Sequence, residues 1–104
     1  MKQAAALLTQ ELTVHRTIEQ LAQEVGLSPT ALKSSFKGIY GSSVYAHQKE
    51  YRLQLAQKLL LETDCTVAEI AHRVGYENPN KFSSAFREAA GMTPTEYRKM
   101  RPIG

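Results

Sequence analysis

The sequence has no tryptophan, only one cysteine and no long apolar run. Because Cys65 is alone, the chain offers neither an internal disulfide nor a cysteine cluster for a metal. No apolar stretch approaches the roughly 20 residues that a membrane-spanning helix needs. We therefore expect a cytoplasmic protein with no membrane partner, in which Cys65 serves as a small apolar side chain.

The groupings that catalysis requires are missing too. The histidines are widely spaced and lack carboxylates at metal-ligand spacing. The serine pairs at 42–43 and 83–84 have no general base at a motif spacing, and there is no glycine-rich phosphate loop. We expect that the chain is not an enzyme, has no catalytic residue, and needs neither a metal nor another cofactor.

What the sequence does contain is a repeat. Residues 18–27 (IEQLAQEVGL) recur as residues 67–76 (VAEIAHRVGY), and a matched pattern continues after each copy. The matched positions are Leu32, Phe36, Lys37 and Gly41 in the first copy and Phe82, Phe86, Arg87 and Gly91 in the second. Each copy predicts a short helix, a glycine turn and a second helix. This is the pattern of a helix-turn-helix, the motif that places its second helix in the DNA major groove.

Local signals support each part of the repeat. The spacing of a capping box marks the start of the first helix in both copies, in Thr17 with Gln20 and in Thr66 with Glu69. Gly26 and Gly75 follow these helices at a position that favours a left-handed backbone. Pro29 and Pro79 fall at the start of the second helices, where a missing N–H does little harm.

We expect an all-α fold. Periodicity and capping signals predict seven helices, at about residues 2–13, 17–25, 29–39, 43–63, 66–74, 79–89 and 94–100. A chain of 104 residues makes one domain or two very small ones. Given the repeat, we expect one DNA-binding domain over 1–104, with a first helix-turn-helix lobe at about 5–41, a connector helix at about 43–63 and a second lobe at about 64–101. As large aromatic side chains, Tyr45, Tyr51, Tyr76 and Tyr97 are expected in the core, with their hydroxyls at its rim.

Charge is unevenly distributed along the chain, although the net charge is only +3. No acidic residue occurs at positions 25–49, which contain three lysines, and none occurs at 78–87, which contain Lys81 and Arg87. The second helix of each motif is therefore cationic and rich in hydroxyl and amide groups. A surface that faces phosphates and base edges needs these groups.

The expected connector helix allows a geometric argument about DNA. About twenty helical residues span about 30 Å, and successive major grooves on one face of B-DNA lie about 34 Å apart. If each motif packs at one end of the connector, the two recognition helices can enter adjacent major grooves of one duplex. This length permits the arrangement but does not fix how each motif is rotated on the helix.

These residues resemble the DNA-binding domain of the AraC/XylS transcription regulators. The resemblance covers about residues 5–101 and is most specific over 70–98, in register with the second copy upstream. It implies a seven-helix, two-lobed bacterial domain, usually attached to an effector-binding or dimerisation domain that this chain does not contain. We then expect promoter DNA as the partner, and RNA polymerase as a partner of the parent regulator. Residues 41–45 (GSSVY) and 51–53 (YRL) also look like the siderophore-uptake regulators of the family.

The resemblance also implies which side chains contact DNA. The base-contact candidates are Thr30, Lys33, Ser34, Asn80, Lys81, Ser83 and Ser84. The phosphate-contact candidates are Thr17, Lys37, Arg52, Thr66 and Arg87. Family members often carry arginine where this chain has Ser34 and Ser84, so strong reading of guanine is in doubt there. The alternative function is a helical protein-protein interaction module without DNA binding, whose affinity would lack a steep salt dependence.

Overall fold

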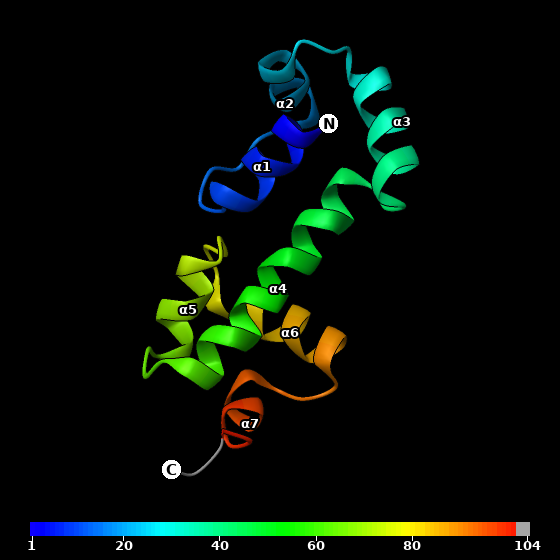
Figure 1. The fold of residues 1–104 in the computed structure, drawn as a ribbon. Coiled ribbons are helices and arrows are strands. Elements are labelled where there is room, and N and C mark those ends of the chain that lie inside the picture. The colour runs from blue at the N-terminus through cyan, green and yellow to red at the C-terminus, as the bar shows by residue number, and fades with distance from the viewer. Residues whose placement is uncertain (102–104) are drawn as a thin grey trace. The chain divides into compact units, whose positions relative to one another are not determined.

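The structure is a computed structural model that describes residues 1–101, and over that range it contains helices and no strand. The helices are α1 (Lys2–Gln10), α2 (Ile18–Val25), α3 (Pro29–Tyr40), α4 (Val44–Glu62), α5 (Val67–Arg73), α6 (Pro79–Ala90) and α7 (Pro94–Arg98). Figure 1 shows them in chain order. The predicted all-α fold with seven helices is confirmed. Within the described range, no helix combines the length and apolarity needed to cross a membrane.

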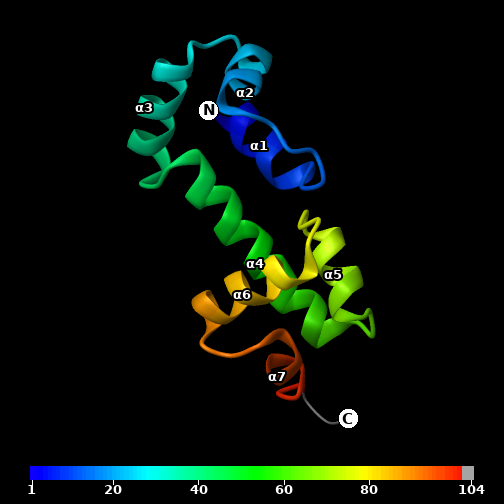
Figure 2. The ribbon, with the colours of Figure 1, turned by 180° about the vertical axis from the view of Figure 1, so that it is seen from behind.

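The chain divides into two compact units, Met1–Tyr51 and Arg52–Gly104. The first unit holds α1, α2, α3 and the beginning of α4, and the second holds the rest of α4 with α5, α6 and α7. Each unit therefore contains one helix-turn-helix, α2–α3 or α5–α6. Both ribbon views show α4 as one unbroken helix that contributes residues to both units (Figures 1 and 2).

The core of the first unit is built from α1, α2, α3 and the first residue of α4. Its buried side chains are Ala4, Leu8, Leu21, Ala22, Leu32, Phe36 and Val44. The centroid of the Phe36 ring lies 4.6 Å from that of Tyr40 and 5.1 Å from that of His47. These ring contacts add to apolar burial, and they hold α3 with its apolar side inward.

The core of the second unit is built in the same way from α4, α5 and α6. Its buried side chains are Leu53, Ala56, Leu60, Ile70, Ala71, Val74, Phe82 and Phe86. The centroid of the Phe86 ring lies 5.8 Å from that of Phe82 and 5.4 Å from that of Tyr97. Phe82 and Phe86 occupy in α6 the places that Leu32 and Phe36 occupy in α3. Both recognition helices therefore turn the same side toward their cores.

The tyrosines divide between core and surface. Tyr76 and Tyr97 pack against the second core, as predicted. Tyr45 is 74% exposed and Tyr51 is 37% exposed, so the prediction that these two are core aromatics is wrong. At the start of α4 the inward place is taken by Val44, which is buried. Because neighbouring residues of a helix point about 100° apart, the ring of Tyr45 is directed outward.

The predicted helix starts and glycine turns are confirmed. At the start of α2, Thr17 Oγ1 accepts from the Gln20 N–H at 3.1 Å and Gln20 Oε1 accepts from the Thr17 N–H at 2.9 Å. The same box begins α5, as predicted, and also α7. Gly26 and Gly75 follow α2 and α5 with φ of 74° and 95°. These left-handed conformations cost little only for glycine, and they set the angle at which each recognition helix leaves its turn.

The first helix is shorter than predicted and ends at Gln10 rather than near Thr13. Glu11 leaves the helical conformation, with φ of −120°, and its Oε2 lies 2.8 Å from Arg16 Nη2. Arg16 Nε also donates to Glu24 Oε2 of α2 at 2.5 Å. The Glu24 hydrogen bond raises the pKa of Arg16, with a further contribution from Glu11. The two ion pairs join this connection to Glu24 of α2.

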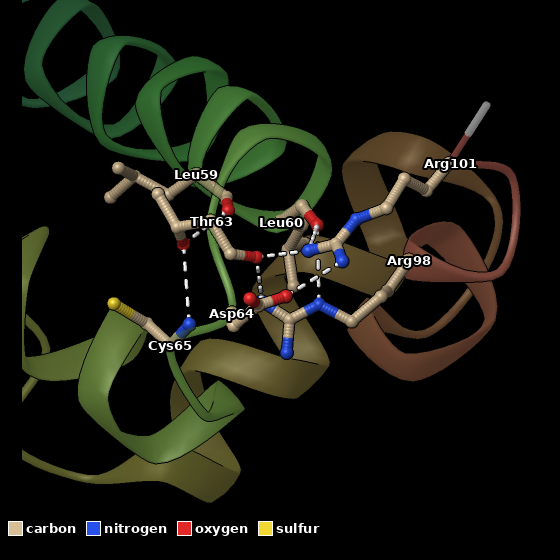
Figure 3. A network of polar contacts seen from close by, with 7 residues as sticks. All are labelled: Leu59, Leu60, Thr63, Asp64, Cys65, Arg98 and Arg101. Atoms are coloured by element: carbon tan, nitrogen blue, oxygen red, sulfur yellow. Dashed lines mark hydrogen bonds and ion pairs between the residues drawn. The ribbon is translucent and has the colours of Figure 1, made fainter. Parts of the chain in front are cut away.

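The last helix is anchored to the end of α4 by two arginines (Figure 3). Arg98 donates from Nε to Leu60 O at 3.1 Å and from Nη2 to Thr63 O at 3.2 Å. Arg101 donates from Nη2 to the same two carbonyls, and its Nη1 lies 2.8 Å from Asp64 Oδ1. The last carbonyls of a helix lack partners within the helix. The guanidinium groups therefore satisfy these acceptors and complement the negative end of the helix dipole.

Candidate nucleic-acid interface

The third helix presents a polar stripe on the side opposite its core contacts. Ser28 caps α3, with its Oγ accepting from the Ala31 N–H at 3.2 Å, and Pro29 fills the first helical position. Leu32 and Phe36 are fully buried. The residues on the opposite side are all exposed and recur at the spacing of one helix face: Thr30, Lys33, Ser34 and Lys37. The structure therefore brings the four α3 candidates together on one surface, the α3 stripe.

The sixth helix carries the equivalent surface. Asn78 caps it, with Oδ1 accepting from the Asn80 N–H at 2.8 Å, and Phe82 and Phe86 point into the core. On the other side lie Asn80, Ser83, Ser84 and Arg87, of which Ser83 is partly buried and the rest are exposed. These four form the α6 stripe. Each member is fifty positions after its counterpart in the α3 stripe. The sequence repeat therefore gives two equivalent surfaces, one on each recognition helix.

Lys81 is the one recognition-helix candidate that lies off its stripe. It is exposed, but it directly follows Asn80 and so points about 100° away around the helix. Glu88, seven residues further along, shares that flank and is also exposed. The α6 stripe proper therefore holds one cation, Arg87, whereas the α3 stripe holds two lysines. A base contact by Lys81 requires its long side chain to reach around the edge of the helix.

The threonines that begin α2 and α5 are exposed, but their polar groups are partly used. Thr17 and Thr66 each accept the N–H of the third helical residue on Oγ1, and each donates its own N–H to the side chain of that residue. A threonine hydroxyl that accepts a hydrogen bond can still donate its own hydrogen. A phosphate at either helix start would therefore be bound by that hydroxyl and by other amides of the first turn, with help from the helix dipole.

Arg52 stands apart from the other phosphate-contact candidates because it contacts the turn of the second motif. Its Nη1 donates to the carbonyl of Gly75 at 3.3 Å. Its guanidinium also lies 5.9 Å from the centroid of the Tyr76 ring, within the range of a cation–π contact. The side chain is partly buried. Sequence spacing gave no signal of this contact, since the two partners are 23 residues apart.

A small cleft beside the α3 stripe was not anticipated from the sequence. It has a volume of about 260 Å³ and is lined by Ile18, Lys33, Lys37, Ser43, Val44 and Tyr45. We refer to it as the Tyr45 cleft. Lys33 and Lys37 belong both to the stripe and to the lining, so the cleft opens at the edge of the candidate interface. Tyr45, which the sequence predicts in the core, lines this cleft with an exposed ring.

Metal-binding side chains are not clustered in the described residues 1–101. Within them, no three or more His, Cys, Asp or Glu side chains gather in an arrangement that could hold a metal ion. Cys65 packs, partly buried, against the second core. The exposed stripes of α3 and α6 are thus the arrangement that a functional assignment must explain.

Comparison with known families agrees with this geometry. The family described as a helix-turn-helix domain matches residues 21–100, which is more than half of the chain. The chain belongs to this family. Several relatives and solved structures are named as AraC-type transcription regulators, and the chain is an AraC-type DNA-binding domain.

Curated relatives of this AraC-type domain are regulators of transcription. It is 35% identical over 81 residues to the HTH-type transcriptional activator RhaR of Enterobacter sp., a match that covers 78% of the chain and 29% of RhaR. It is 33% identical over 84 residues to the arabinose operon regulatory protein of Salmonella typhimurium, covering 81% of the chain and 30% of that protein. Across eight such relatives the matched region makes up 12% to 30% of the full length.

Solved structures match the fold over nearly the whole chain. The C-terminal domain of AraT, a response regulator from Geobacillus stearothermophilus, superposes with a TM-score of 0.91 at 33% identity, covering 99% of this chain and 86% of that one. The DNA-binding domain of AdpA, solved in complex with a target DNA, superposes with a TM-score of 0.89 at 27% identity, covering 95% and 89%.

Proposed function

We propose that the α3 stripe and the α6 stripe are the surfaces with which this domain contacts promoter DNA, each from within a major groove. The observation that carries the proposal is their equivalence. Two exposed polar stripes lie at matched positions of two helices, each opposite a pair of large buried side chains. Hydroxyl, amide and ammonium groups in such stripes can hydrogen-bond to base edges, while cations at their ends bind phosphates.

The individual roles follow from side-chain chemistry. Base contacts are assigned to Thr30, Lys33, Ser34, Asn80, Lys81, Ser83 and Ser84. Phosphate contacts are assigned to Thr17, Lys37, Arg52, Thr66 and Arg87. Asn80 has the amide that best matches adenine, through paired hydrogen bonds. Ser34 and Ser84 are short, so they read bases at close approach or through a bridging water.

We infer that both stripes bind one duplex at once. The helix α4 continues for 19 residues without a break, which corresponds to about 28 Å of helix. Adjacent major grooves on one face of the duplex lie about 34 Å apart. A stiff connector of this length supports simultaneous docking in two adjacent grooves. One chain would then read two DNA segments, a task that most helix-turn-helix proteins perform as dimers.

We further propose that the domain works within a longer cytoplasmic regulator in a bacterium. The matched region is a minor part of its relatives, which leaves room for an effector-binding or dimerisation domain and for contacts with RNA polymerase. The segments 41–45 and 51–53 support an assignment to regulators of siderophore uptake. Transcription of iron-uptake genes, compared with and without the regulator under iron limitation, tests that assignment. An unchanged response would reject it.

The salt dependence of DNA affinity tests the proposed interface. With about five to eight phosphate contacts, affinity for a duplex should fall by orders of magnitude between about 50 and 200 mM salt. Lys37→Ala and Arg87→Ala should each weaken binding to all sequences by a similar factor and reduce the salt slope by about 1. Fluorescence anisotropy with a selected duplex and a random duplex measures both effects.

Two results would contradict the assignment. Salt-insensitive binding would favour a protein-interaction module over a DNA-binding surface. A change in preferred sequence with no change in slope would show that Lys37 or Arg87 contacts a base instead of a phosphate.

A further inference from the structure

We propose that the Tyr45 cleft holds a deoxyribose and its flanking phosphates, on the DNA strand that borders the groove entered by α3. This inference rests on the proposed function of the α3 stripe. It adds to that stripe an aromatic contact that none of the assigned DNA contacts provides. Tyr45 would therefore help to position the first motif on the duplex without reading its sequence.

The position of the cleft supports this placement. Three elements meet there: Ile18 at the start of α2, Lys33 and Lys37 on the outward side of α3, and Ser43 to Tyr45 at the start of α4. Because the two lysines are also members of the α3 stripe, DNA bound to that stripe passes directly over the opening. The Tyr45 ring is 74% exposed and is therefore accessible to the strand.

The chemistry of the lining selects the occupant. The walls are apolar side chains, those of Ile18 and Val44 and the ring of Tyr45. Lys37, assigned above to a phosphate, supplies positive charge at the rim, and the base-contact candidate Lys33 adds to it. The six lining residues include no acid. A deoxyribose is an uncharged ring with an anionic phosphate on either side, so it matches an apolar cleft with a cationic rim.

The volume of the Tyr45 cleft and the dipole of α4 both favour a deoxyribose with its flanking phosphates. The cleft volume of about 260 Å³ is below the range of about 300–1,000 Å³ typical of sites for free small molecules. A single group that belongs to a larger polymer is the better fit. Ser43 Oγ accepts from the Ala46 N–H at 3.1 Å and so caps α4. The positive end of that helix dipole therefore lies at the cleft, where it favours an anion.

The second motif provides an internal control. Residues 93–95 (Thr-Pro-Thr) correspond to residues 43–45 (Ser-Val-Tyr). Pro94 is buried like Val44, but the exposed position beside it is Thr95 in place of Tyr45. The aromatic contact is thus a feature of the first motif alone. Thr95→Ala is the matched variant in which no such contact is removed.

The test compares Tyr45→Ala, Tyr45→Phe and Thr95→Ala with the unmodified chain. Two duplex probes are used, one selected from a random pool by the unmodified chain and one unrelated duplex of equal length. Tyr45→Ala should weaken binding to both probes about tenfold, because a ring contact is lost. Tyr45→Phe and Thr95→Ala should remain within about twofold of the unmodified chain. The salt slope should not change, since no charge is removed.

Two further readouts assign the contact. The melting temperature of Tyr45→Ala should equal that of the unmodified chain, because the ring is 74% exposed. Hydroxyl-radical footprinting should show a protected deoxyribose next to the first contact segment, and Tyr45→Ala should lose that protection.

Several outcomes would overturn the inference. One is Tyr45→Ala binding as tightly as the unmodified chain. Another is a loss confined to the selected duplex, which would mean base reading. A third is a loss that accompanies a lowered melting temperature, which would mean a role in folding. Failure of the unmodified chain to bind any duplex would reject the proposed function as well. Binding by the unmodified chain with no effect of Tyr45→Ala would reject this inference alone.

Discussion

Replacing glycine with alanine should have opposite effects on stability at two positions of this domain. Gly75 is buried in the turn of the second motif, with φ of 95°, whereas Gly38 lies inside α3, and a Cβ there would meet open space. Gly75→Ala should reduce the free energy of unfolding by about 1 kcal/mol or more and lower DNA affinity. Gly38→Ala should raise the free energy of unfolding by about 0.5–1 kcal/mol. Thermal melting of both variants checks the pair, and an unchanged melting curve for Gly75→Ala would show that this turn does not depend on glycine.

Arg52 is the residue whose two possible roles can be separated by measurement. Its hydrogen bond to the Gly75 carbonyl predicts that Arg52→Met, which keeps the apolar stem, lowers the free energy of unfolding by about 1 kcal/mol. The assigned phosphate contact predicts that the same variant reduces the salt slope of DNA binding by about 1. Arg73→Met, at an exposed arginine of α5, is the control. A lower stability with an unchanged slope would leave anchoring of the turn as the whole role of Arg52.

At the scale of elements, the attachment of α7 to α4 should depend on pH. The hydrogen bond from Arg101 holds the pKa of Asp64 below its ordinary value of 3.8. The Thr93 backbone N–H similarly lowers the pKa of Glu96 at the start of α7. A carboxyl with a lowered folded-state pKa stabilises the fold above its unfolded-state pKa, and this contribution is lost as the pH falls through the folded-state pKa.

Melting temperatures measured from neutral pH downward check this expectation. Stability should fall below about pH 4, and Asp64→Asn should make that fall less steep. Glu62→Gln, at an exposed carboxylate of the same segment, is the control. Because both titrating carboxylates are exposed, the effect should be modest. An acid transition that Asp64→Asn leaves unaltered would mean that the Arg101 pair does not stabilise the attachment.

Among the elements, features set by nearby residues can be predicted from the sequence, whereas features set by distant partners cannot. Capping boxes and glycine turns rest on residues at most seven positions apart, and the structure places them as expected. The connection after α1 is joined to α2 by Arg16 and Glu24, which are eight positions apart. The attachment of α7 joins Arg98 to Leu60, 38 positions away. Helical periodicity carries no information about such partners, so these features and the outward ring of Tyr45 became visible only in the fold.

At the scale of the whole molecule, we propose that one chain reads two DNA segments. Each unit has its own core and its own stripe, and α4 contributes to both units as one helix. The α3 stripe has two lysines and a neighbouring aromatic cleft, while the α6 stripe has an asparagine and one arginine. We therefore expect the first motif to supply more of the backbone affinity and the second more of the base discrimination.

The separation of the two contact segments in the DNA tests this account most directly. The measurement is the affinity of the chain for its selected duplex after insertion of five or ten base pairs between the segments. Five base pairs rotate one segment by about half a turn, and ten restore the face but add about 34 Å. Under the proposal that α4 holds the two motifs at one spacing, both insertions should abolish specific binding and leave only the salt-sensitive, non-specific component. Specific affinity that survives both insertions would contradict the account, because a single motif would then carry recognition alone.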